Sequence, residues 1–255
     1  MAQAPTLDTL IEPSARNLAT FFTGIARRGM CWDDAWAGDL GLADPIVNST
    51  TLIQPMTNAT TRDLTDRLDG FYREAEGGPW MLWSVWPTPD LAPLGYSPAG
   101  HPPLMARPAG TPPAPRPEGL QIVEATDEAE LAVFERGLIE WTPLEHVGTF
   151  LPGDVISPKI LEGPLRCWVG YAYDVPVTVA MGSAGDGVVG VYCVATAPDA
   201  RGKGYGAAIT DVAARCDESL PAVLQASSMG RPVYERIGFT SIGTCSLWIR
   251  QRRPA

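Results

Sequence analysis

The sequence predicts an α/β protein of the α+β type, in which a smaller α/β domain precedes a mixed, mostly antiparallel sheet flanked by helices. Three observations support this fold class. Segments with strand-like and helix-like spacing of apolar residues alternate along the chain. Hairpin turns, such as Asp186-Gly187, join the strands of the second half. A glycine-rich turn then joins a strongly apolar strand to a helix.

The composition indicates a folded chain with few charges. It has 255 residues, of which 45% are hydrophobic and 19% charged, with a net charge of −10. The acidic balance argues against nucleic acid as the main partner, because phosphate binding needs clustered Lys and Arg. The five cysteines are scattered and form no C-x-x-C pair, which indicates reduced thiols and no metal site. A signal peptide and a membrane-spanning apolar stretch are both lacking, so we expect a cytoplasmic protein without a membrane partner.

Prolines mark a break in the middle of the chain. They crowd the segment between Pro98 and Gly119. Because proline fixes φ and lacks an N–H donor, we expect an extended, semi-rigid connector there, neither helix nor inner strand. The predicted domains are therefore residues 1–118, ending in this connector, and residues 119–255.

The first domain is expected to hold a strand–helix–strand core. Apolar residues at helical spacing predict an amphipathic helix from about Pro13 to Gly29. The elements expected after it are a strand at 46–53, a helix from Thr60 or Thr61 toward Gly77-Gly78, and a strand at 80–86. This half shows neither a phosphate loop nor a cluster of catalytic side chains.

The second domain begins with a strand at 120–123 and a helix from Thr126 to Trp141. Strands at 167–173 and 175–181 form a pair that turns at Asp174. Residues 188–195 are almost continuously apolar, which is typical of a strand well inside a sheet. The elements expected after it are the glycine-rich turn, a helix to Cys216, a strand at 222–226, a short helix at 232–237, and one or two strands between 240 and 250.

The glycine-rich turn at residues 201–206 predicts an anion-binding site. Backbone N–H groups converge where the following helix begins, and glycines let an anion approach them. Arg201 and Lys203 would add charge-assisted contacts. The mononucleotide pattern G-x-x-x-x-G-K-[ST] is absent, and the G-x-G-x-G spacing, late in the chain, does not fit a dinucleotide fold. A glycine turn without a ligand stays open as the alternative.

The same six residues, Arg-Gly-Lys-Gly-Tyr-Gly, match the [RQ]-x-x-G-x-[GA] motif of the GNAT acetyltransferase superfamily. Residues 191–198 resemble the strand that precedes this motif. Residues 224–227 and 234–239 resemble the second motif of the family, which closes with Tyr-x-x-x-Gly-Phe. The resemblance covers roughly Gly119 to Arg250. The first domain is similar to a degenerate form of the same core without its glycine loop, which would make the chain a tandem GNAT arrangement. An unrelated α/β extension that covers the catalytic domain stays open as the alternative.

The resemblance implies that acetyl-coenzyme A is the cosubstrate of an acyltransferase that acetylates a primary amine in a ternary complex. The Val194 N–H would face the thioester carbonyl, and Thr196 would pair with the pantetheine amides. Tyr234 would protonate the departing thiolate. The implied cofactor-binding residues are Val194, Ala195, Thr196, Arg201, Gly202, Lys203, Gly204, Tyr205, Gly206 and Ser227, the last of which stands where many relatives have Asn.

The general base and the acceptor are less defined. Some relatives carry a Glu at the position of Gly190, and here the nearest polar side chain on that face is Tyr192, acting through water. Glu140, Glu145 and His146 fall in the region that usually walls the acceptor pocket, although each is more typical of a surface residue. The expected acceptor is a small amine or a peptide amine. A homodimer and a preference for another acyl-coenzyme A stay open. The missing carboxylate supports an alternative, a non-catalytic coenzyme A-binding sensor or pseudoenzyme.

Overall fold

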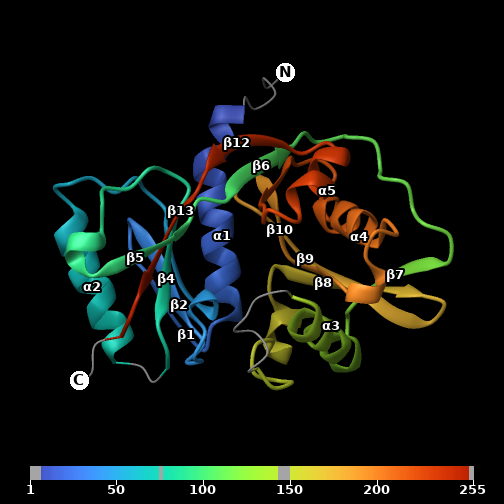
Figure 1. The fold of residues 1–255 in the computed structure, drawn as a ribbon, viewed down its shortest axis with the longest axis horizontal. Coiled ribbons are helices and arrows are strands. Elements are labelled where there is room, and N and C mark those ends of the chain that lie inside the picture. The colour runs from blue at the N-terminus through green and yellow to red at the C-terminus, as the bar shows by residue number, and fades with distance from the viewer. Residues whose placement is uncertain (1–6, 75–76, 143–149, 253–255) are drawn as a thin grey trace. The chain divides into compact units, whose positions relative to one another are not determined.

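The computed structural model describes residues 7–74, 77–142 and 150–252, which divide into two compact units (Figure 1). The first unit combines Met1–Leu104 with Ser241–Ala255, and the second is Met105–Thr240. These boundaries differ from the predicted ones at residue 118. The proline-rich segment after residue 107 belongs to the second unit, and the last strand of the chain belongs to the first.

The first unit contains a six-stranded sheet in the order β1-β2-β3-β4-β13-β5. The strands are β1 (Arg28–Cys31), β2 (Ala35–Asp39), β3 (Asn48–Leu52), β4 (Trp80–Ser84), β13 (Ser246–Arg250) and β5 (Tyr96–Gly100). Strands β3 and β4 are parallel, and the pairs β1–β2, β2–β3, β4–β13 and β13–β5 are antiparallel. Residues of α2 (Thr61–Arg73) pack with Leu82, whereas Ala15 of α1 (Ile11–Ile25) packs with Met81. Because neighbouring strand residues point to opposite faces, the two helices cover opposite faces of this sheet.

The second sheet has seven strands in the order β12-β6-β11-β10-β9-β8-β7. They are β12 (Thr240–Thr244), β6 (Pro103–Arg107), β11 (Ala222–Gln225), β10 (Val188–Thr196), β9 (Val175–Gly185), β8 (Leu165–Ala172) and β7 (Leu120–Glu124). Strands β7 to β10 are consecutively antiparallel, and β10 and β11 are parallel. The predicted α/β fold class, with a mixed and mostly antiparallel sheet, is confirmed.

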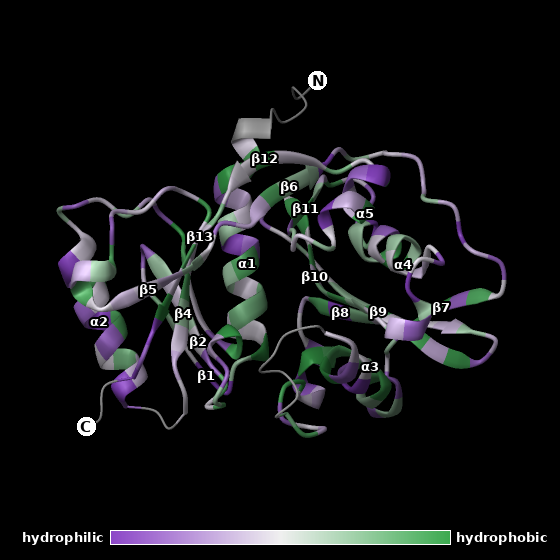
Figure 2. Cartoon of the chain, viewed as in Figure 1, coloured by the Kyte–Doolittle hydropathy of each residue, from purple (hydrophilic) through white to green (hydrophobic). Residues whose placement is uncertain are grey.

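The helices of the second unit are α3 (Glu128–Trp141), α4 (Tyr205–Ala214) and α5 (Arg231–Arg236). Ile209 and Ala213 of α4 share a buried core with Val189 and Val191 of β10 and Leu224 of β11. Figure 2 shows the apolar residues concentrated along the central strands of this sheet. Only a short segment connects the end of β10 to the start of α4. Together with this packing, it keeps the amino-terminal end of α4 close to the end of β10.

The same order of strands and helices occurs twice along the chain, and we call each occurrence a repeat. Each sheet contains one strand from the other repeat. Strands β2, β3, helix α2 and β4 correspond in order and strand direction to β9, β10, α4 and β11, and β5 and β12 follow them at the same place in the order. In the first sheet β13 lies between β4 and β5, and in the second β6 lies between β11 and β12. The final strand of each repeat therefore completes the sheet of the other repeat.

This exchange corrects the prediction of a connector between Pro98 and Gly119. That segment holds most of β5 and the whole of β6, which is an inner strand of the second sheet. Pro103 is tolerated because it is the first residue of its strand. Beyond it, residues 104–107 are all buried, and the connector begins only at Pro108.

Two arginines attach the end of the chain to the first unit. Arg250 on β13 donates to both carboxylate oxygens of Asp69, at 3.1 and 2.7 Å, and to the Leu94 carbonyl at 2.6 Å. Arg252 donates to Asp39 and to the Tyr72 carbonyl, at 2.7 and 2.8 Å. Charge-assisted hydrogen bonds thus hold β13 in the first sheet, in addition to its pairing with the neighbouring strands.

A buried ion pair attaches β6 to α4 in the second unit. Arg107 and Asp211 are 2.7 Å apart, with side chains only 3% and 7% exposed. We expect Arg107→Met to lower the free energy of unfolding by about 3–5 kcal/mol, because the Asp211 carboxylate would stay buried without a partner. Urea unfolding of the full chain measures this loss.

The matched control is Arg166→Met, which removes the partner of Glu124 in a pair with side chains 47% and 31% exposed. We expect a loss of about 1 kcal/mol or less, because exposed pairs contribute little. Equal losses in the two variants would contradict the role of the buried pair.

In the described part of the chain, no helix has the length and apolar character that crossing a membrane requires.

Candidate active site

Strands β10 and β11 part soon after they meet. Their parallel register is limited to Val189↔Ala222 and Gly190↔Val223. Strand β10 continues to Thr196 and β11 to Gln225 without further pairing between them. The facing edges therefore leave backbone groups for a ligand that can pair like a strand. Val194 and Thr196, to which the resemblance assigns backbone contacts with the cosubstrate, lie on the part of β10 that no longer pairs with β11.

A β-bulge lies in β10 beside this opening. The register with β9 passes from Tyr192↔Met181 to Ala195↔Val179, so Cys193 and Val194 stand opposite a single residue. Cys193 has a φ of 54°, in the left-handed region. Bulges of this kind redirect backbone groups and side chains. Val194, the predicted donor to the thioester oxygen, thus lies where the strand changes direction.

The glycine-rich turn after β10 forms a backbone cradle. Gly202 and Gly204 have φ values of 77° and 85°, and Gly204 is the N-cap of α4. Among the described residues, none accepts a hydrogen bond from the amides of residues 202–207. A Cβ at Gly206 would lie 3.1 Å from the Thr196 hydroxyl, so the close approach of loop and strand favours glycine. Free amides at a helix N-terminus fit a diphosphate such as that of coenzyme A.

The two charged side chains of the turn, Arg201 and Lys203, differ in their contacts. Arg201 donates to the carbonyls of Thr196 and Trp141, both at 3.1 Å, and so ties the turn to the ends of β10 and α3. These two N–H groups position the turn, and the predicted contact of the guanidinium with a phosphate stays a prediction. Lys203 is exposed and carries the cation that can reach an anion on the loop.

The end of β10 is held by a buried threonine. The Thr178 hydroxyl donates to the Ala195 carbonyl at 3.0 Å and lies 2.9 Å from the Thr196 hydroxyl. Thr178 itself is fully buried. The predicted cofactor-binding residues Ala195 and Thr196 are thereby fixed on the β9 side, while their other edge faces the opening.

Helix α5 carries the predicted proton donor. Tyr234 packs against Phe239, with ring centroids 6.1 Å apart, and its ring lies against Gly230. Burial raises the pKa of Tyr234 to about 12, so the hydroxyl stays protonated at neutral pH. The Ser227 hydroxyl accepts from the Gly230 N–H at 3.0 Å, which gives this predicted cofactor contact a local role in the turn before α5.

The candidates for a base are constrained by burial. Burial raises the pKa of Tyr192 well above its ordinary value, so the side chain cannot readily act as a phenolate. Gly190 offers no carboxylate. Glu140 is exposed on α3, and Glu145 and His146 lie outside the described residues.

Sequence reasoning missed Glu135 on α3. This buried carboxylate accepts from the amides of Gly153, Val155 and Ile156, at 2.6, 2.9 and 2.9 Å. It fixes the segment that follows residues 143–149, in the region predicted to wall the acceptor pocket. The available signal was its position on the apolar side of the helix, next to Phe134 and one turn after Leu131.

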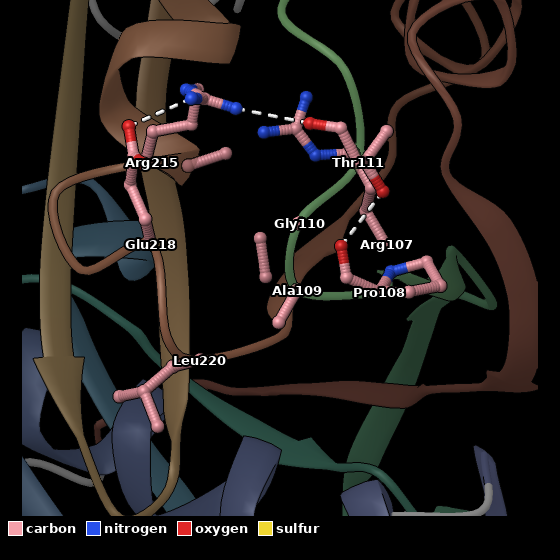
Figure 3. Close-up of a pocket in the computed structure, with 10 residues that line it drawn as sticks. Arg107, Pro108, Ala109, Gly110, Thr111, Arg215, Glu218 and Leu220 are labelled. Atoms are coloured by element: carbon pink, nitrogen blue, oxygen red, sulfur yellow. Dashed lines mark hydrogen bonds and ion pairs between the residues drawn. The ribbon is translucent and has the colours of Figure 1, made fainter. Parts of the chain in front are cut away.

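Figure 3 shows a small pocket of the second unit, lined in part by Arg107, Thr111, Arg215, Glu218 and Leu220. Arg215 donates to the Thr111 carbonyl at 3.0 Å and to Glu218 at 2.7 Å. None of the predicted site residues lines it. Arg107 pairs with Asp211, so the charged side chains of this pocket already have partners, and the chemistry is not assigned to it.

Among the described residues of the first unit, no equivalent cradle is present. Strands β3 and β4 stay paired over three positions, from Ser49↔Met81 to Thr51↔Trp83. The segment before α2 contains no glycine, and the Thr57 carbonyl accepts from the amides of Thr60 and Thr61 at 3.1 and 3.0 Å. The amides at the start of this helix are thus partly used by the loop itself.

Comparison with known proteins shows a likeness at the level of the fold. No protein-family model matches the chain, and no curated protein matches it significantly. A GCN5-related N-acetyltransferase from Kribbella flavida is similar in structure, with a TM-score of 0.68 and 18% identity over 93% of this chain and 95% of that one. A GCN5-related N-acetyltransferase from Sphaerobacter thermophilus gives a TM-score of 0.54 at 14% identity, over 100% and 96%.

A third similar structure is a tandem GNAT protein from the clavulanic acid biosynthesis pathway. Its TM-score is 0.53 at 11% identity, over 87% of this chain and 80% of that one. The match extends over both units, which agrees with the repeated order of elements. The chain therefore has the fold of the GCN5-related N-acetyltransferases, in a tandem arrangement.

Proposed function

We propose that this chain is an N-acetyltransferase that transfers the acetyl group of acetyl-coenzyme A to a primary amine. The observation that carries the proposal is the opening between β10 and β11, which leads to the glycine cradle at the start of α4. The opening suits an extended pantetheine chain, and the cradle suits its diphosphate.

The residues proposed to hold the cosubstrate come from β10 and the turn after it. Backbone groups of Val194, Ala195 and Thr196 would pair with the pantetheine amides. The amides of Gly202, Lys203, Gly204, Tyr205 and Gly206 would bind the diphosphate, aided by the Lys203 cation. Arg201 and Ser227 would support the site by holding the turns on which it is built.

The chemistry proposed is direct attack by the amine. The Val194 N–H would stabilise negative charge on the thioester oxygen, and Tyr234 would supply a proton to the departing sulfur. Burial raises the pKa of the Cys193 thiol to about 12, which disfavours a thiolate nucleophile in the bulge. Transfer without a covalent enzyme intermediate is therefore the simpler route. Tyr192 would hold a water that carries away the proton of the amine.

A second candidate function is a coenzyme A-binding sensor without turnover. The absence of a carboxylate at Gly190 and the neutral state of Tyr192 favour it. A panel of small amines, amino acids and peptide amino termini, read by release of free thiol from acetyl-coenzyme A, separates the two. Thiol release that depends on one class of amine supports the enzyme. Tight binding of acetyl-coenzyme A without release on any amine supports the sensor.

Tyr234→Phe is expected to lower turnover at least about tenfold, roughly 1.4 kcal/mol of barrier, with little change in cofactor affinity. The ring would keep its packing against Phe239 while the proton donor is lost. Steady-state kinetics with the acceptor found in the panel measure turnover, and calorimetry measures affinity. Normal turnover where the chemical step limits the rate would leave Tyr234 with a packing role only.

A further inference from the structure

Gln225 on β11 has a buried hydrogen-bond donor that the mechanism above does not use. Its amide nitrogen, Nε2, is buried and has no partner among the described residues. A buried amide N–H without a partner is unfavourable, and such groups are rare in native proteins. A ligand that presents an oxygen to this nitrogen would supply the missing acceptor.

The strand register places Gln225 at the opening between the parted strands. The last pair of β10 and β11 is Gly190↔Val223. Two residues further along these parallel strands, Tyr192 and Gln225 stand across the gap from each other. They share a face with Gly190 and Val223 because side chains alternate along a strand.

The intervening residues confirm this assignment of faces. Val191 and Leu224 both belong to the core that packs under α4. Gln225 therefore lies on the opposite face, level with the start of the bulge at Cys193 and Val194. The Gln225 amide is therefore near the bulge that contains Val194, whose N–H is proposed to donate to the thioester oxygen.

We propose that Gln225 Nε2 donates a hydrogen bond to the thioester carbonyl oxygen of bound acetyl-coenzyme A, as a side-chain partner of the Val194 N–H. The assignment rests on the proposed function. Side-chain amides are suitable donors to a developing oxyanion, and they act strongly where water is excluded. Because the amide is neutral and does not titrate, its contribution is independent of pH.

The amine nitrogen forms a bond to the acetyl carbon, and the π pair of the carbonyl moves onto its oxygen, where both donors stabilise it. That pair then re-forms the carbonyl as the carbon–sulfur bond breaks. The sulfur leaves with the bonding pair and takes a proton from Tyr234. The amine releases its extra proton to water, and the Tyr234 hydroxyl is restored from solvent.

Gln225→Leu tests the proposal because it keeps the approximate size of the side chain and removes the donor. The probe is acetyl-coenzyme A with a ¹³C-labelled carbonyl, bound to the full chain and observed by infrared difference spectroscopy. We expect the carbonyl stretch at lower frequency in the unmodified protein than in Gln225→Leu. We also expect acetyl transfer to slow by about 10²–10³-fold. Affinity for free coenzyme A, which has no carbonyl, should stay within about twofold.

Gln121→Leu is the matched control, since Gln121 is an exposed glutamine on β7 of the same sheet. It should leave the carbonyl frequency unchanged. If Gln225→Leu does not fold, Gln225→Met replaces it with the same expectations. An identical frequency in the unmodified and donor-free proteins, both saturated with the probe, overturns the proposal. Failure of the unmodified protein to bind acetyl-coenzyme A would instead overturn the proposed function.

Discussion

Gly204→Asp is expected to abolish binding of acetyl-coenzyme A while the chain stays folded. The substituted carboxylate would stand at the N-cap of α4, where the amides of the turn are proposed to meet the diphosphate. Repulsion between the two anions should weaken binding at least about 100-fold, or roughly 2.7 kcal/mol. Calorimetric titration of acetyl-coenzyme A into the variant measures the loss.

Gly204→Asn separates charge from shape in this experiment. Asn has nearly the same size as Asp, and both tolerate the left-handed conformation that Gly204 adopts, with a φ of 85°. The Asn variant should therefore retain more of the affinity than the Asp variant. Unchanged affinity in a folded Gly204→Asp protein would show that the diphosphate binds elsewhere.

The fragment Gly119–Ala255 is expected not to fold by itself, although the sequence motifs all lie within it. It lacks β6, which stands between β11 and β12, and with it the buried residues Met105 and Arg107. Asp211 would lose its partner, and β13 would lose the sheet into which it fits. Broad, poorly dispersed amide signals in a ¹H–¹⁵N correlation spectrum would be the result.

Adding residues 1–118 as a second fragment should restore the native spectrum, because the two fragments together contain both exchanged strands. Residues 1–118 with the β6 segment 103–107 deleted are the control, and they should not restore it. A well-dispersed spectrum of Gly119–Ala255 alone would contradict the view that β6 is an essential inner strand of the second unit.

Local patterns predicted much of the second unit. The apolar run at 188–195 indicated an inner strand because such a strand is buried on both faces. The glycines of the turn indicated a backbone cradle because their conformations exclude most side chains. These features depend on neighbouring residues alone, so they can be recognised in the sequence.

The exchange of β6 and β13 could not be predicted in this way. Alternating apolar residues mark a strand and its buried face, but they do not identify the strand beside it. Pro102 and Pro103 also favoured a connector over an inner strand. The short strands β1 and β2 escaped prediction because β1 is mostly exposed and shows no clear alternation.

The sequence predicted the parts of the candidate site that are formed by backbone groups. The roles of Arg201, Glu135 and Gln225 depend on residues distant in the sequence. Arg201 holds a carbonyl of α3, and Glu135 holds amides on a later segment. The buried nitrogen of Gln225 is defined by the parting of two strands. Only the folded chain reveals these relations.

Hydrogen–deuterium exchange of the full chain, with and without saturating acetyl-coenzyme A, tests the central claim most directly. We predict slower exchange at the amides of residues 202–207 and 191–196, because these would bind the diphosphate and the pantetheine chain. The corresponding segment of the first unit, residues 57–61, should show no change. Unchanged exchange at residues 202–207, or slower exchange confined to the first unit, would contradict the account.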